Sequence, residues 1–263
     1  MAVTMSFQNF QGLQSQEWVG LTNYENVFKL VRFNQALVNT TIYTIGTLLI
    51  LIPLPLVLAV LLDSRRVVQS TVFRTLIFLP ALTSLVVAGT VFRLILAEGG
   101  FLNLFLSSAF DIEPLRWLEV SELALPSLIL VAAWRWTGIN ILYFNAGLVN
   151  IPREFYEAAV IDGASAFQMF WRITLPLLRP TTLFVVVLSI IGGYQVFVEP
   201  FILYTGGGGP GDGGLTMALL IYRTAFTSFN FGTAAAMGVI LAAIILVFSL
   251  IQFRFFGMSD RED

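Results

Sequence analysis

Long apolar runs separated by short polar loops dominate the sequence. The runs cover residues 37–62, 72–96, 123–149, 181–204 and 234–256. At ~1.5 Å per helical residue, each run is long enough to cross the ~30 Å hydrocarbon core of a bilayer. The pattern therefore predicts an all-α polytopic membrane protein with five spans. Pro53 and Pro55 predict kinks in the first span.

Polar segments flank and connect these runs. Residues 1–36 are polar and aromatic, without the charged start, long apolar core and small-residue cleavage site of a signal peptide. We expect an exterior segment there rather than a span. Residues 150–180 form a long loop, and residues 257–263 form a short polar tail.

The arginines predict the orientation, because short cytoplasmic loops are enriched in positive charge. Those expected on the cytoplasmic side are Arg65, Arg66, Arg74, Arg153, Arg172, Arg179, Arg254 and Arg261. The opposite loops hold Lys29, Arg32, Arg116 and Arg223, together with more acidic residues. We therefore expect loop 150–180 and the tail in the cytoplasm.

Composition supports a membrane protein and excludes several chemistries. Of the 263 residues, 57% are hydrophobic and only 11% are charged, and the mean hydropathy is +0.84. The absence of Cys and His removes thiol chemistry, Cys/His zinc sites and histidine-based triads. The single lysine, Lys29, is not part of a phosphate-binding loop. We expect no catalytic or metal site, no nucleic-acid partner, and ATP hydrolysis only on another chain.

Loop 150–180 predicts two short helices. Asn150 or Ile151 can cap the first helix, with Pro152 in its first turn and Gly163 as a left-handed stop. Ser165 can cap the second helix, and prolines 176 and 180 are expected to break it.

The first of these helices has the residues of a docking surface. Ala158 and Ala159 leave a low surface between Phe155 and Asp162, on which the backbone of another protein can approach closely. The alternative is an amphipathic loop that lies on the membrane surface.

The loop also resembles a known family. The order Glu157-Ala158-Ala159, Asp162-Gly163-Ala164, Leu175-Pro176 and Pro180 is similar to the EAA loop of permease subunits of bacterial ABC importers, particularly those for carbohydrates. In that family the loop is the cytoplasmic coupling helix that docks on an ATPase subunit. The resemblance assigns this role to Glu157, Ala158, Ala159, Asp162 and Gly163.

The resemblance extends over residues 19–257 and implies the type I ABC importer permease fold. Such permeases usually begin with a further membrane helix, which we expect to be absent from this sequence. Residues 192–257 resemble the end of carbohydrate permeases, where an exterior scoop-like helix meets a solute-binding protein. The glycine-rich stretch 205–214 lacks the lysine of a phosphate loop and predicts a flexible exterior turn.

Polar residues inside the third and fourth runs indicate a substrate pathway. Tyr194 and Gln195 follow two glycines near mid-membrane and offer stacking and hydrogen-bonding groups to a sugar. The alternative is that the glycines allow tight helix packing and that Gln195 bonds a neighbouring helix.

Arg135 lies deep in the third run, and Asn140 lies five residues further on. An intramembrane charge is expected to face a cavity or a partner, and Glu199 is the candidate partner by type. Arg135 can instead extend toward the surface or pair across a subunit boundary.

The resemblance implies a permease subunit of a binding-protein-dependent importer of disaccharides or oligosaccharides in the bacterial inner membrane. Its implied partners are a second homologous permease, two ATPase subunits that hold ATP and Mg, an exterior solute-binding protein and membrane lipid. Glycerol phosphate or another polar metabolite is the alternative substrate. A secondary transporter would usually show coupling-ion residues or inverted repeats, and none is evident.

Overall fold

The computed structural model describes residues 1–10, 17–63 and 70–257. The N-terminal half contains α1 (Ala2–Met5), β1 (Gln8–Asn9), β2 (Glu17–Trp18), α2 (Thr22–Lys29), α3 (Val31–Leu51), α4 (Pro53–Asp63), α5 (Ser70–Leu82), α6 (Leu85–Ile95), α7 (Phe101–Phe110) and α8 (Ser121–Val149). The remainder contains α9 (Arg153–Ile161), α10 (Ala166–Met169), the π-helix η1 (Phe170–Thr174), α11 (Leu175–Leu177), α12 (Arg179–Tyr194), α13 (Val198–Leu203), the 3-10 helix η2 (Pro210–Asp212), α14 (Met217–Tyr222), the π-helix η3 (Arg223–Thr227) and α15 (Phe231–Gly257).

The chain forms two compact units. The first unit comprises residues 1–46, 84–131 and 190–250, and the second comprises residues 47–83, 132–189 and those from 251 onwards. Several long helices, such as α3 and α8, contribute residues to both units. Each unit has its own buried apolar cluster.

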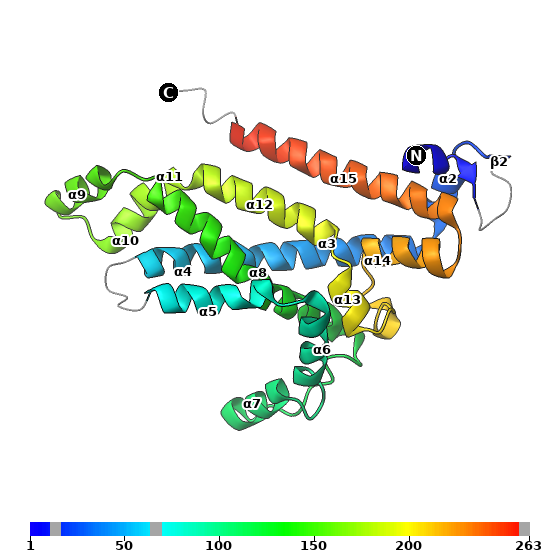
Figure 1. Ribbon diagram of the computed structural model, residues 1–263, viewed down its shortest axis with the longest axis horizontal. Helices are drawn as coiled ribbons and strands as arrows, with labels where there is room; N and C mark the ends of the chain where they lie inside the picture. Colours follow the sequence, from blue (N-terminus) through cyan, green and yellow to red (C-terminus); the bar gives the residue numbers. More distant parts are fainter. Residues whose placement is uncertain (11–16, 64–69, 258–263) are drawn as a thin grey trace. The chain divides into compact units, whose positions relative to one another are not determined.

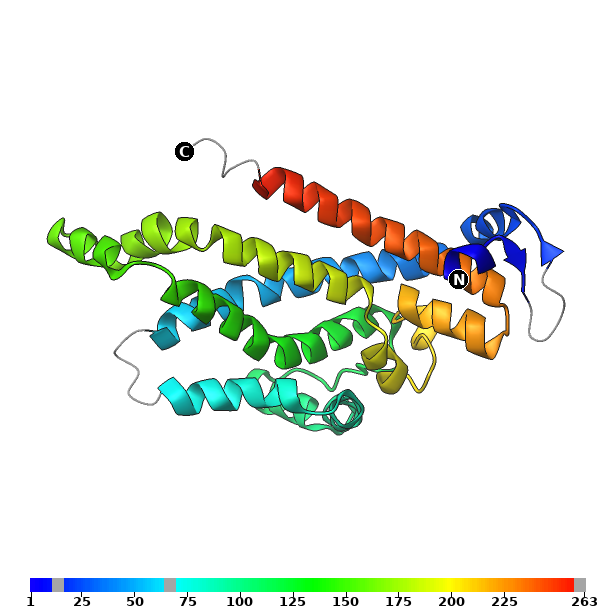
Figure 2. The same ribbon diagram turned by 45° about the horizontal axis from the view of Figure 1, so that its top comes forward.

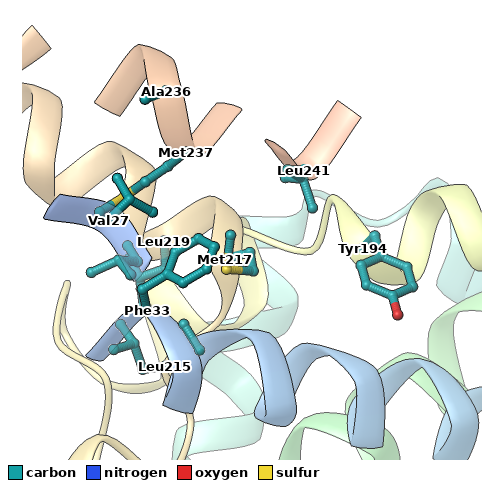
Figure 3. Close-up of a cluster of buried hydrophobic side chains, with 11 residues drawn as sticks. Val27, Phe33, Tyr194, Leu215, Met217, Leu219, Ala236, Met237 and Leu241 are labelled. Carbon is teal, nitrogen blue, oxygen red and sulfur yellow. The ribbon is translucent and has the colours of Figure 1, made fainter. Parts of the chain in front are cut away.

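Helices α2, α3, α14 and α15 supply most of the apolar cluster of the first unit (Figure 3). Phe33, Met217 and Met237 are at most 1% exposed. In the second unit, α4, α8 and α12 pack together through Ala59, Phe144 and other apolar side chains. Ala59 on α4 and Phe144 on α8 are more than eighty positions apart in the sequence.

Three helical stretches among the described residues are long and apolar enough to cross a membrane. They are Val31–Leu62, Ser121–Val149 and Phe231–Arg254, and up to five spans result if two broken helix pairs each count as one. The expected runs 123–149 and 234–256 agree with α8 and α15 to within three residues.

The first span begins earlier than expected. Residues 31–36, assigned to the exterior segment from their polarity, are the first turns of α3. Two of their polar side chains have partners, since Arg32 pairs with Asp212 and Gln35 donates to the Gly211 carbonyl. The preceding segment also contains a two-residue antiparallel hairpin, in which Gln8 faces Trp18, so the chain is not purely α-helical.

Two of the expected spans are not single helices. Run 72–96 is divided at Ser84, which has the non-helical backbone angles of a helix cap (φ −55°, ψ 132°). Run 181–204 is divided after Tyr194, where α12 ends, and α13 begins only at Val198. Pro200 has no N–H to donate to the Val196 carbonyl, and the Thr216 hydroxyl donates to it instead at 2.9 Å.

Candidate functional site

Helix α9 and the elements after it connect α8 to α12 within the second unit. Figures 1 and 2 show α9 and α10 extending beyond the ends of the two helices that they join. The N-cap of α9 is Pro152 itself, with an extended ψ of 131°. The prediction that Asn150 or Ile151 caps the helix was wrong, because Pro152 still has extended geometry and the first helical residue is Arg153.

The predicted end of α9 is confirmed. Gly163 has a φ of +76°, in the left-handed region that glycine adopts at little cost. The Gly163 N–H donates to the Val160 carbonyl at 3.1 Å, and the Ala164 N–H donates to the Ala159 carbonyl at 2.9 Å. The helix therefore ends in a left-handed cap after nine residues.

The predicted cap of the second helix is also confirmed. The Ser165 hydroxyl accepts from the Gln168 N–H at 3.3 Å, and the Gln168 side chain accepts from the Ser165 N–H at 2.8 Å. The break predicted from Pro176 and Pro180 is confirmed, because the helix ends at Leu177 and the chain bends by 66° before α12 begins at Arg179. The π-helical turn η1 precedes Pro176, and its wider backbone spacing accommodates a residue without an N–H.

The predicted coupling residues form an exposed surface. Glu157, Ala158, Asp162 and Gly163 are exposed, and Ala159 is half-buried. None of the residues of α9, all of which the structure describes, is buried. Large apolar side chains share this exposure, with Phe155, Val160 and Ile161 at 52%, 62% and 86%.

This surface is nevertheless firmly attached to the second unit. The Tyr156 hydroxyl lies 2.9 Å from the Thr174 hydroxyl, which joins α9 to η1. Ile151 before α9 and Leu178 after α11 are 7% and 0% exposed and belong to the apolar cluster of the unit. These contacts connect α9 to the ends of α8 and α12.

The predicted pathway residues Tyr194 and Gln195 differ in their surroundings. Tyr194 is buried, its hydroxyl lies 3.1 Å from that of Thr41, and its ring stacks on Phe248. Gln195 is exposed. A Cβ on Gly193 would lie 2.6 Å from the Thr44 hydroxyl, so Gly193 permits close helix packing. A sugar could reach Gln195 in this structure more readily than Tyr194.

Arg135 stabilises the end of a neighbouring helix. Its guanidinium donates to the Thr83 carbonyl, directly after α5, where the helix dipole favours a positive charge. The same group lies 5.4 Å from the ring centre of Trp136. Its buried Nε has no hydrogen-bond partner among the described residues. Glu199 is buried in the other unit, and the pairing of these two residues stays a prediction.

Asn140 supplies a hydrogen bond to a backbone carbonyl of the second unit that lacks its helical partner. Pro55 has no N–H, so the Leu51 carbonyl lacks its helical donor, and the Asn140 amide donates to it at 2.8 Å. The helix is interrupted between α3 and α4, just before Pro53, but residues 31–62 form one membrane span, so a kink at Pro53 and Pro55 stays a prediction. The position of Asn140 has this structural explanation, whereas its contact with substrate stays a prediction.

Two buried polar groups in the second unit are not among the predicted pathway residues. Both amide atoms of Asn145 and the hydroxyl of Thr182 are buried without a hydrogen-bond partner in the described part of the chain. A polar residue within an apolar run was the available signal for both. Part of the predicted orientation lies outside the described residues, since it used Arg65, Arg66 and Arg261. The predicted tail after residue 257 lies outside them too.

The glycine-rich turn is held by contacts within the first unit. The Asp212 carboxylate pairs with Arg32 at 2.8 Å and with Arg223 at 3.7 Å. The Asn39 amide donates to the carbonyls of Asp212 and Leu215 at 2.9 and 3.1 Å. These contacts fix a turn that was expected to be flexible.

Comparisons with known proteins place these features in context. A family model, described as "Binding-protein-dependent transport system inner membrane component", matches residues 35–257. The chain is 43% identical over 265 residues to the arabinooligosaccharides transport system permease protein AraP of Halalkalibacterium halodurans, and the match covers 100% of this chain and 82% of that protein.

Two solved structures share the fold. A bacterial ABC transporter involved in the import of the acidic polysaccharide alginate has a TM-score of 0.82 at 24% identity, over 97% of this chain and 87% of that one. A bacterial alginate ABC transporter in complex with an alginate pentasaccharide-bound periplasmic protein has a TM-score of 0.79 at 25% identity, over 89% and 82% of the two chains.

Proposed function

The chain belongs to the family of binding-protein-dependent transport system inner membrane components, and we propose that it is the permease subunit of an ATP-driven oligosaccharide importer. It is a membrane-integral transport protein with the permease fold of type I ABC importers. The 43% identity to an arabinooligosaccharide permease over the whole chain supports a neutral oligosaccharide as the substrate. We place the protein in the cytoplasmic membrane of a bacterium.

The observation that carries the proposal is the exposed, anchored surface of α9. Its apolar side chains Phe155 and Ile161 are 52% and 86% exposed. Exposed apolar side chains of this size, grouped on one short helix, are characteristic of protein interfaces. We propose that an ATPase subunit covers α9 and that the residues in contact are Glu157, Ala158, Ala159, Asp162 and Gly163.

The mechanism is alternating access. In this proposal, two ATPase subunits bind ATP with Mg and close, and the movement reaches α8 and α12 through Ile151 and Leu178. A contact can shift the equilibrium between two conformations only if it differs between them. The α9 contact is therefore expected to differ between the inward-facing and outward-facing states. A second homologous permease and an exterior solute-binding protein complete the complex. The candidate residues of the substrate pathway are Tyr194, Gln195, Arg135, Asn140 and Glu199.

The test is co-purification from membranes through a tag on this chain. The intact chain is expected to recover an ATPase and a second permease. Glu157→Lys reverses the charge of an exposed residue on α9, and Gly163→Pro removes its left-handed end, so both variants should lose the ATPase. Glu113→Lys is the matched control, because Glu113 is an exposed acid far from α9 in the sequence.

The result depends on stable expression of each variant. Recovery of the ATPase by the intact chain and Glu113→Lys, but not by the α9 variants, would support the coupling role. A stable intact chain that recovers no ATPase would contradict the proposal. ATP-driven uptake of arabinotriose by the reconstituted complex tests the substrate separately.

A further inference from the structure

A cavity of about 620 Å³ with a mixed polar and apolar lining lies in the first unit. Three segments line it: the end of α6, residues 116–119 ahead of α8, and the stretch around Tyr204 that follows α13. Its volume falls in the range of ~300–1,000 Å³ typical of small-ligand sites. No residue of the proposed α9 surface or of the candidate pathway is among those that line it.

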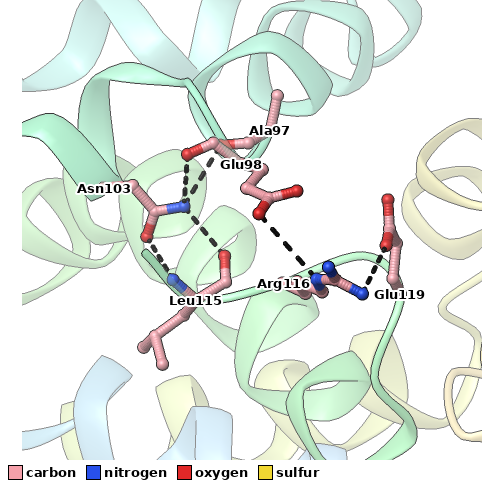
Figure 4. A network of polar contacts seen from close by, with 6 residues as sticks. All are labelled: Ala97, Glu98, Asn103, Leu115, Arg116 and Glu119. Atoms are coloured by element: carbon pink, nitrogen blue, oxygen red, sulfur yellow. Dashed lines mark hydrogen bonds and ion pairs between the residues drawn. The ribbon is translucent and has the colours of Figure 1, made fainter. Parts of the chain in front are cut away.

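A buried asparagine holds two of these walls in place (Figure 4). Asn103 is 2% exposed and donates to the carbonyls of Glu98 and Leu115 at 3.0 and 2.8 Å. Its side-chain oxygen accepts from the Leu115 N–H and from the Trp117 Nε1–H, both at 3.0 Å. This single side chain therefore fixes both the backbone beside Glu98 and the indole ring of Trp117.

The third wall is similarly fixed. The Tyr204 hydroxyl donates to the Ala124 carbonyl at 3.0 Å, and the residue is 8% exposed. Two aromatic residues of the cavity are thus held rigidly by hydrogen bonds. Pre-organised groups bind a ligand with a smaller loss of conformational entropy.

The charged groups of the cavity are, in contrast, accessible and balanced. The Arg116 guanidinium lies 3.8 Å from the Glu98 carboxylate and 4.0 Å from that of Glu119. Their side chains are 57–66% exposed, so these ion pairs are weak and their groups can bond a ligand. With Arg93, the lining has two positive and two negative side chains, which favours neither an anion nor a cation.

We propose that this cavity binds an uncharged oligosaccharide, separately from the transport pathway. Carboxylates accept hydrogen bonds and guanidinium groups donate them, which suits neighbouring sugar hydroxyls. Trp117 offers an apolar ring for the faces of the sugar. This inference rests on the proposed function, which supplies both the class of sugar and the exterior position of the cavity. In that position the cavity would hold a substrate when it first reaches the permease.

The test uses the complex with its ATPase and second permease in lipid nanodiscs, without the solute-binding protein. The tryptophans are replaced biosynthetically by 5-fluorotryptophan, and the Trp117 fluorine resonance is assigned by its disappearance in Trp117→Phe. Arabinotriose is expected to shift this resonance in a saturable manner. The double variant Glu98→Gln, Glu119→Gln should weaken the affinity at least tenfold, whereas Glu113→Gln, an exposed acid outside the lining, should not.

Parallel uptake measurements separate the two proposals. Normal ATP-driven uptake of arabinotriose with no shift at Trp117, or with a shift that the double variant does not weaken, would overturn the cavity site alone. A double variant that loses affinity for the solute-binding protein while arabinotriose still shifts Trp117 normally would overturn it in favour of a protein-docking surface. A complex that neither transports arabinotriose nor shows the shift would contradict both proposals.

Discussion

Helix α9 and the glycine-rich turn at 205–214 are both short polar segments between apolar helices, yet their side chains are used differently. No residue of α9, which the structure describes in full, is buried, and its apolar side chains point outward. The turn is followed by Leu215 and Thr216, both 0% exposed, and its Asp212 has two arginine partners.

The difference indicates which segment depends on another protein. Contacts within the chain satisfy the polar groups of the turn, so its geometry is part of the folded chain. The side chains of α9 lack such contacts over most of their surface, although the helix is anchored at both ends. Substitutions in the turn should therefore lower the stability of the fold, whereas substitutions on α9 should affect assembly.

The largest loss of stability is expected for Thr40→Val. The Thr40 hydroxyl accepts from the Met217 N–H at 2.9 Å, at the start of α14 directly after the turn, and both residues are 0% exposed. Valine keeps the shape but leaves this N–H without an acceptor, which costs about 1–3 kcal/mol. Thermal unfolding of the purified full chain in detergent micelles, followed by circular dichroism, measures the loss.

The matched control is Thr90→Val. In the part of the chain that the structure describes, the Thr90 hydroxyl bonds only to the Val86 carbonyl within its own helix, at 2.9 Å, and the residue is exposed. Loss of the Thr90 hydroxyl should change the free energy of unfolding by less than ~0.5 kcal/mol. Equal effects of the two substitutions would show that the contact with Met217 does not stabilise the turn.

A smaller loss is expected for Asp212→Asn. Asparagine tolerates the positive φ of +56° at this position but removes the charge that pairs with Arg32 and Arg223. Because the Arg32 side chain is 60% exposed, solvent screens that pair, and we expect a loss of only about 1 kcal/mol. The effect should shrink as the salt concentration rises, and a loss independent of salt would contradict an ionic cause.

Local sequence signals predicted local structure well. Ser165 and Gln168 stand three residues apart, and Gly163 follows an amphipathic helix, so the cap and the left-handed stop were both evident from neighbouring residues. The exposure of α9 was likewise expected from a short continuous stretch, whereas its coupling role stays a prediction.

Contacts between distant residues were not predictable in the same way. Thr40 and Asn39 bind groups more than 170 positions away, and no periodicity reveals such pairs. Polarity placed residues 31–36 outside α3 for the same reason, since the partner of Arg32 lies at Asp212. The interruptions at Ser84 and after Tyr194 were hidden because hydropathy measures the length of an apolar run, not its straightness.

On α9, Gly163→Ala should destabilise only the end of the helix. Nothing lies within 4 Å of the added Cβ, so the cost comes from the φ of +76° alone. That cost is about 1 kcal/mol and should speed the opening of α9 about fivefold. Hydrogen exchange of the α9 amides measures this rate. Gly192→Ala, which is also without neighbours within 4 Å but lies inside a helix, is the control and should leave α9 unchanged.

The smallest effect on stability is expected for Ile161→Ser, where the comparison is sharpest. Ile161 is 86% exposed, so its side chain buries little apolar area within the chain. The free energy of unfolding should therefore change by less than ~0.5 kcal/mol. If an ATPase covers this side chain, the same substitution removes buried apolar area from the interface and should reduce ATPase recovery from membranes severalfold. Leu104→Ser on α7, where Leu104 is 63% exposed, is the control for removal of an exposed apolar side chain and should retain the ATPase. An Ile161→Ser chain that unfolds normally and recovers the ATPase in full would remove Ile161 from the interface, whereas a destabilised chain would show that α9 depends on its own fold as the turn does.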